Sequence, residues 1–177
     1  MSQDAIVLTG VKETLTALAQ FDKDAVKGFN KVINSELRQA KVEAQGFVQA
    51  KPPLSGWKTE PPRKPRSRGG AGWPAWDQSV IKAGISASKA EGKVRGDYTT
   101  SAGGLKNRSA AGVIYEIAGR INKSGTFVSN LEAKEGNASR LVWKAVDIHK
   151  DRILRNVSQA LDEAKAKLQK HLNMEKG

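Results

Sequence analysis

The chain of 177 residues has a net charge of +12, a hydrophobic content of 38% and no cysteine. This content is enough for one domain with a modest core, and the lack of cysteine excludes a disulfide framework, a thiolate metal site and a cysteine nucleophile. Its apolar runs are too short for a signal peptide or a membrane-spanning helix, so we expect a soluble cytoplasmic protein. The excess of Lys and Arg favours polyanions or acidic protein surfaces as partners.

A long amphipathic helix is predicted over Phe21 to Ala50, after a short apolar run that could form an edge strand. Asp22 suits the N-cap position, and the residue before Pro52 is pushed out of the helical region, so the helix should end near Ala50. Apolar residues recur between these limits at intervals of three or four, as one stripe of a helix does. They are Val26, Phe29, Ile33, Leu37, Ala40, Ala44 and Phe47.

Residues 51 to 76 form a basic segment that contains all six prolines of the chain. We expect an extended arm or long loop, because proline and glycine at this density prevent packed secondary structure. Three tryptophans are interleaved with its cations. The candidate contact residues are Trp57, Arg63, Lys64, Arg66, Arg68, Trp73 and Trp76. They could stack on and neutralise single-stranded nucleic acid, or anchor the arm on a neighbouring subunit. We favour the subunit arm, because no folded nucleic-acid platform is recognisable.

A small, mostly antiparallel sheet is predicted for the middle of the chain. Residues 79 to 88 alternate between apolar and polar, which is typical of a strand, and a turn leads to a second strand at 93 to 98. The apolar stretch 110 to 119, AAGVIYEIAG, is predicted to be the central strand. The polar stretches 99 to 109 and 120 to 138 are predicted to be loops.

A second long helix is predicted over Val146 to Leu172, with a helical pattern beginning at Leu141 behind Ser139 as a possible cap. Its apolar stripe consists of Leu154, Val157, Leu161, Ala164, Leu168 and Leu172. The two long helices should cover the sheet. The sequence therefore predicts an α+β fold over residues 1 to 177 as a single domain, with 51 to 76 as its arm.

Candidate catalytic and metal-binding residues are few. His149 and His171 lie 22 positions apart with no partners for a metal site, and Ser86 and Lys89 match an SxxK motif that would need a helix. Glu116 lies within the apolar stretch, where a salt bridge or a solvated sheet face explains it better than a raised pKa for catalysis. We therefore expect no enzyme activity, no metal and no cofactor. A small hydrolase built on Ser86 or Glu116 remains an alternative.

The order of features resembles the tail-completion or neck family of long-tailed double-stranded DNA phages. The resemblance is carried by VLTGVKETLTAL near the N-terminus, the step from Pro53 to Gly56, Tyr115-Glu116 followed by Gly119, and the step from Arg140 to Val146 into the last helix. It extends over nearly the whole chain. Members of this family usually have Glu, an aromatic residue and Gly in direct succession, whereas here Ile117 and Ala118 separate Glu116 from Gly119.

This resemblance implies a structural virion protein that forms a ring at the head-to-tail junction. The implied partners are other copies of the chain, in a sixfold or twelvefold ring, and other neck and tail proteins. DNA would pass through the lumen without sequence-specific binding, and no membrane would be involved. The implied location is the virion neck, with the host cytoplasm during assembly. The alternative is a basic, non-enzymatic nucleic-acid-binding protein that uses the arm of residues 51 to 76.

Overall fold

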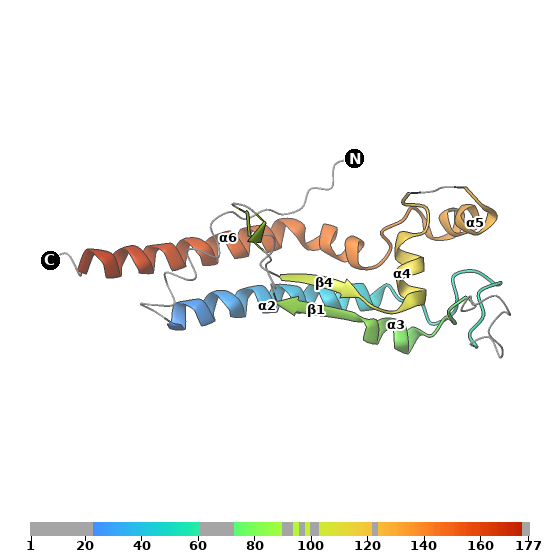
Figure 1. Ribbon diagram of the computed structural model, residues 1–177, viewed down its shortest axis with the longest axis horizontal. Coiled ribbons are helices and arrows are strands. Elements are labelled where there is room, and N and C mark those ends of the chain that lie inside the picture. The colour runs from blue at the N-terminus through green and yellow to red at the C-terminus, as the bar shows by residue number, and fades with distance from the viewer. Residues whose placement is uncertain are drawn as a thin grey trace. The chain divides into compact units, whose positions relative to one another are not determined.

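The computed structural model describes residues 23–60, 73–89, 94–95, 98–99, 103–121 and 124–174 (Figure 1). The predicted α+β class is confirmed. The helices are α2 (Lys23–Gly46), α3 (Gln78–Gly84), α4 (Ala110–Ile117), α5 (Thr126–Glu135) and α6 (Val142–Met174). The strands are β1 (Ile85–Lys89), β2 (Val94–Arg95), β3 (Tyr98–Thr99) and β4 (Gly103–Asn107).

Strand pairing is limited in the described residues. β1 pairs with β4 in one two-stranded sheet, and β2 pairs with β3 in another. The second pair is antiparallel, with Val94 opposite Thr99 and Arg95 opposite Tyr98. The predicted strand over 93 to 98 was therefore wrong in extent, because Val94–Arg95 and Tyr98–Thr99 are two separate strands that pair with each other. β4 also lies within the predicted loop 99 to 109.

The chain divides into two compact units, each built from separate stretches of sequence. The first unit contains residues 1–39, 87–104 and 149–177, and the second contains 40–86 and 105–148. We describe each unit by itself. That the whole chain forms a single domain stays a prediction.

The described core of the first unit is a helix pair. Phe29 and Ile33 of α2 pack with Val157, Ala160 and Leu161 of α6, and Ala25 forms a smaller cluster with Ala164. All of these positions except Ala25 and Ala160 lie on the two predicted apolar stripes. The predictions of the long helices are confirmed, although α2 ends at Gly46 rather than Ala50. Asp22, the predicted N-cap, lies outside the described residues.

The stretch predicted as the central strand is instead helix α4. The hydroxyl of Ser109 accepts a hydrogen bond from the N–H of Gly112 at 3.1 Å, which caps the first turn. Ala111 and Tyr115 lie four residues apart and are both buried, so one helical face meets the core. The apolar alternation was misleading because both faces of a short buried helix contain apolar residues.

Two further predictions are corrected nearby. Residues 78 to 84 form α3, because the Asp77 carboxylate accepts hydrogen bonds from the N–H groups of Ser79 and Val80, at 2.8 and 3.2 Å. Only from Ile85 onward is the predicted strand observed. The predicted loop 120 to 138 contains α5, which Leu131 pins to the core through a fully buried side chain.

The core of the second unit draws on most of its segments, and it includes the ends of the predicted arm. Its buried residues are Ala44, Val48, Trp57, Trp76, Ile81, Ile85, Ala111, Tyr115, Leu131, Leu141 and Ala145. Pro53 is also fully buried. Residues 51 to 60 and 73 to 77 are therefore packed into the unit, although they form neither helix nor strand.

Candidate interaction surface

A buried carboxylate fixes the start of α6. The Glu116 side chain is 5% exposed and accepts hydrogen bonds from the backbone N–H groups of Leu141 and Trp143, the latter at 2.9 Å. The first N–H groups of a helix have no partner within it and lie at the positive end of its dipole, so a carboxylate satisfies both the bonds and the field. Glu116, not the predicted Ser139, caps α6. Ser139 instead has a φ of 77°, in the left-handed region.

A buried arginine binds carbonyl groups at the C-terminal ends of two other helices. Arg140 donates from Nη1 to the carbonyls of Tyr115 and Ala118, at 2.7 and 3.0 Å, where α4 ends. Its Nε and Nη2 donate to the carbonyl of Gly136, the C-cap of α5, at 3.0 and 2.7 Å. A cation at helix C-termini is favourable, and the rigid guanidinium fork reaches several acceptors together. Burial lowers the pKa of Arg140, yet an arginine stays charged.

Tyr115 links this arrangement to the rest of the second unit. Its hydroxyl donates to Glu135 Oε2 at 3.1 Å, and its ring lies 5.3 Å from that of Trp76 and 5.6 Å from the Arg140 guanidinium. Burial, and then the neighbouring Glu135 carboxylate, raise the pKa of Tyr115 well above its usual value. We call Tyr115, Glu116 and Arg140 the junction cluster, because together they hold α4, α5 and the start of α6.

Gly119 completes the turn after α4. Its φ of 90° lies in the left-handed region that glycine tolerates. A Cβ there would also collide with the carboxylate of Glu132. The backbone conformation therefore favours glycine at this position, whereas the Glu132 carboxylate is the end of a flexible side chain that can move away. Tyr115, Glu116, Gly119 and Arg140, which carry part of the family resemblance, therefore belong to one structural junction rather than to separate sites.

The three tryptophans of the predicted arm form a cluster inside the second unit. Trp57 and Trp76 are 5% and 2% exposed, and their ring centroids lie 5.1 Å apart in an edge contact. The indole of Trp57 donates to the carbonyl of Pro74 at 2.9 Å, and that of Trp76 donates to the carbonyl of Gln49 at 3.1 Å. These two residues are core anchors of their own chain and leave little surface for another molecule. That the arm contacts a neighbouring subunit or nucleic acid stays a prediction.

Trp73 is the exception among the three. It packs on Phe127, with ring centroids 4.8 Å apart, but remains 57% exposed. Its ring also lies 5.8 Å from that of Trp57. An indole held by two ring contacts with more than half of its surface in solvent is suited to contact a partner. The predicted contact residues Arg63, Lys64, Arg66 and Arg68 lie outside the described residues.

Sequence reasoning missed a second exposed apolar group on this unit. Trp143 is 41% exposed on the first turn of α6, and the Arg120 guanidinium lies 5.0 Å from the centroid of its ring. Ile117 and Ile121, on and just after α4, are 48% and 98% exposed. We call these four residues the Trp143 patch. Tryptophan and arginine are enriched among residues that dominate protein interfaces. The sequence did not reveal this group, because Arg120 and Trp143 are 23 positions apart and are brought together only by the fold.

Charge is also unevenly divided between the units. Over its full sequence the second unit has 15 Lys and Arg against 7 Asp and Glu, a net charge of +8, whereas the first has 15 against 11, a net of +4. Exposed cations of the second unit include Lys51, Lys58, Lys106, Arg108 and Lys144. Its surface therefore favours acidic partners more strongly than that of the first unit.

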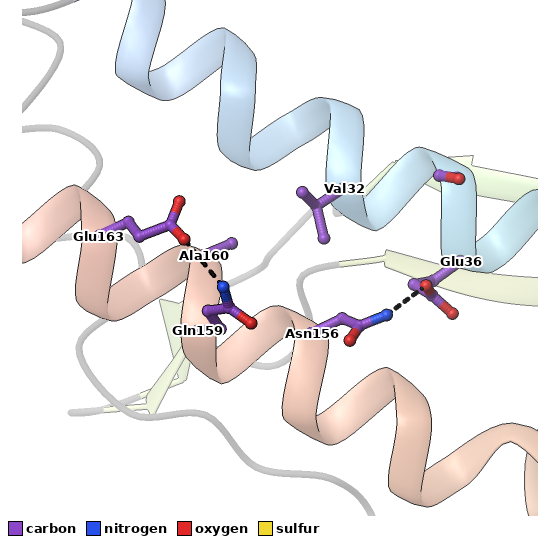
Figure 2. Close-up of a pocket in the computed structure, with 7 residues that line it drawn as sticks. Val32, Glu36, Asn156, Gln159, Ala160 and Glu163 are labelled. Atoms are coloured by element: carbon purple, nitrogen blue, oxygen red, sulfur yellow. Dashed lines mark hydrogen bonds between the residues drawn. The ribbon is translucent and has the colours of Figure 1, made fainter.

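The first unit contains a shallow groove of about 260 Å³ between α2 and α6 (Figure 2). Val32 and Ala160 form its apolar part, and polar side chains surround them: Ser35, Glu36, Asn156, Gln159 and Glu163. Glu36 is buried and accepts hydrogen bonds from Arg152 Nε at 3.0 Å and Asn156 Nδ2 at 2.8 Å. Glu163 is exposed and accepts one from Gln159 at 3.0 Å.

The described residues offer little for catalysis or metal binding. Glu116 is engaged by backbone N–H groups, and Ser86 and Lys89 lie on β1, not on the helix that an SxxK site needs. Within the described ranges, no three His, Asp or Glu side chains are grouped as a metal site requires. None of the helices in this part of the chain combines the length and apolar character needed to cross a bilayer.

Comparison with known proteins adds no relative: no family model matches the chain, and no curated protein or solved structure is significantly similar to it.

Proposed function

We propose that this protein is a structural component of a phage neck, which forms a ring at the head-to-tail junction and acts by assembly rather than by catalysis. The observation that carries the proposal is the Trp143 patch. Glu116 of the junction cluster binds the backbone of Trp143, and Arg120 lies over the exposed indole. Ile117 and Ile121, on and just after the same helix α4, are exposed as well. Large apolar side chains held rigidly in solvent mark a surface that a protein partner covers.

The sequence resemblance gives this interface its biological setting. The junction that supports the patch is built by residues that carry the resemblance: Tyr115, Glu116, Gly119 and Arg140. A closed ring gives every subunit the same heterologous contact, so one exposed patch for each chain can complete the assembly. The proposed partners are other copies of the chain, in a sixfold or twelvefold ring, and neighbouring neck and tail proteins.

The test is the mass of the purified protein in solution. Native mass spectrometry and sedimentation velocity should find a closed ring at micromolar concentration, and electron microscopy should show its central channel. The variant Trp143→Ala should shift the distribution toward monomers. Val80→Ala is a matched control, because Val80 is similarly exposed at 56% but lies on α3. A protein that remains monomeric at every concentration contradicts the proposal.

The segment between the two packed tryptophans permits a separate test in virions. Deleting residues 61 to 72 leaves Trp57 and Trp76 in the chain, so the second unit should still fold. If the segment reaches neighbouring subunits, particles with this deletion should contain heads and tails that fail to join. Normal virions from the deletion variant would remove the segment from the mechanism.

A nucleic-acid-binding function is the second candidate, and the charge of the second unit favours it. The binding constant for DNA should then fall steeply between 50 and 200 mM salt, by about a thousandfold if six phosphates are contacted. Changing Arg63, Lys64, Arg66 and Arg68 to alanine should abolish binding. A ring without measurable DNA affinity would favour the neck function, and a DNA-bound monomer would favour this alternative.

A further inference from the structure

A ring requires two different complementary surfaces on each subunit, because its contacts run head to tail. The Trp143 patch is one such surface. It is mostly apolar, and Arg120 makes it cationic. The groove of the first unit has the opposite chemistry. Val32 and Ala160 provide an apolar floor, and carboxylates of Glu36 and Glu163 lie beside it (Figure 2).

We propose that the groove receives the Trp143 patch of a second copy of the chain, with Ile121 in the groove and Arg120 facing Glu163. The inference rests on the proposed ring and names the residues of its contact. Ile121 is 98% exposed and is adjacent in sequence to the cation. An aliphatic side chain that protrudes beside an arginine is what an apolar groove with a carboxylate rim can bind.

The dimensions of the groove agree with this occupant. Its volume is about 260 Å³, more than the roughly 150 Å³ of an engineered cavity that admits benzene. A branched four-carbon side chain therefore fits. Val32 and Ala160, which line the groove, would be desolvated by that side chain, and this burial would favour association.

Charge distinguishes this occupant from the others. Glu36 is already paired with Arg152 and Asn156, whereas Glu163 is exposed and accepts a hydrogen bond from the neutral Gln159. Glu163 can therefore pair with an incoming cation. DNA or an acidic protein segment would meet repulsion at these carboxylates. The second copy supplies an isoleucine and an arginine together, which matches both parts of the groove.

The experiment is a charge exchange measured by native mass spectrometry and sedimentation velocity on the full chain. Arg120→Glu and Glu163→Lys should each weaken ring formation by about tenfold or more in the assembly dissociation constant, since each puts like charges together. The double variant carrying both changes should return to within about threefold of the wild-type constant, because the pair is restored in reverse. Ile121→Ser should weaken assembly without touching the charges.

Matched controls guard against general charge effects. Lys134→Glu changes an exposed cation on α5 of the second unit, and Asp162→Lys changes an exposed acid that does not line the groove. Both controls should assemble as the wild type does. Circular dichroism should show that every variant is folded, since the substituted side chains are exposed.

The possible results separate the contact from the function. Rings that tolerate both single reversals, or a double variant that fails to recover while the controls assemble, would overturn this contact and leave the ring proposal standing. A wild-type chain that never self-associates would overturn both.

Discussion

The two units of this protein reach stability by different means. The first unit packs aliphatic side chains and Phe29 from one face of each of two helices. The second joins eleven buried residues from helices, a strand and irregular segments, including two tryptophans and a tyrosine. Local periodicity is enough to specify the first kind of core. The second depends on contacts between residues far apart in sequence, and it is the one that presents the exposed tryptophans.

This difference predicts unequal resistance to opening. Regions with few buried apolar contacts exchange their amide hydrogens through low-energy local openings, whereas well-packed regions need nearly global unfolding. The two cores also differ in the hydrogen bonds and ion pairs that their polar side chains make. The junction cluster supplies several charge-assisted hydrogen bonds to backbone groups, whereas in the described part of the first unit Glu36 pairs with an Arg152 side chain that is 38% exposed. The predictions below test this contrast.

The largest effect is expected for the tryptophan core. Trp76→Ala should lower the free energy of unfolding by about 3–5 kcal/mol, because it opens a cavity at a fully buried site. Trp73→Ala is the matched change at an exposed site and should cost less than about 1 kcal/mol. Urea denaturation followed by circular dichroism measures both. Equal losses for the two variants would contradict the assignment of Trp76 to the core.

The junction cluster should come next. Arg140→Ala leaves the carbonyls of Tyr115, Ala118 and Gly136 without their guanidinium donor, the first of them in a buried hydrogen bond, at a cost of about 2–4 kcal/mol. Arg140→Lys should recover little, because an ammonium lacks the planar fork that reaches several acceptors. Thermal unfolding of both variants tests this. Full rescue by lysine would mean that the charge alone matters.

A smaller loss is expected in the first unit. Glu36→Gln removes the charge that faces Arg152 and should cost about 1 kcal/mol, since the arginine remains partly solvated. Hydrogen exchange should then speed up in α2 around residues 29 to 36 and leave α4 unchanged. Glu43→Gln, on the same helix but in the second unit, is the control. An equal increase in both units would show that they open together.

The smallest effect concerns alkaline pH. The folded protein raises the pKa of Tyr115. The contribution of the neutral phenol to the free energy of unfolding is therefore fully present below the pKa of an unfolded tyrosine, about 10, and is lost as the pH rises above it. Tyr115→Phe should flatten this part of the stability profile. In a Tyr98→Phe background, tyrosinate absorbance should appear together with unfolding. Titration of a folded protein near pH 10 would contradict the burial of this phenol.

Sequence reasoning succeeded where the pattern was local. The α+β class and both long helices were predictable, because residues such as Phe29 and Ile33 or Val157 and Leu161 recur with helical spacing. It failed for α4 and α3, although Ser109 and Asp77 are ordinary N-caps. Their short apolar sequences alternate as a strand does, and with so few residues the two periods are hard to distinguish.

The candidate site was less accessible to prediction than the fold. Trp57, Trp73 and Trp76 were predicted as contact residues, but nothing in the local sequence indicates that the first and last are buried and the middle one is exposed. The pairing of Glu116 with Leu141 and Trp143 crosses 25 or more residues. It could not be predicted once α4 had been interpreted as a strand.

The capping of α6 by Glu116 has an evolutionary corollary. The position at which α6 begins is set by a side chain of α4, and Arg140 ties the same point back to the carbonyl of Tyr115. The start of α6 is thus fixed by these two contacts and not by the length of the intervening connector alone. A homologue that retains the carboxylate and the guanidinium should keep the start of the final helix, and changes of length in the connector are expected outside α5, whose Leu131 belongs to the core.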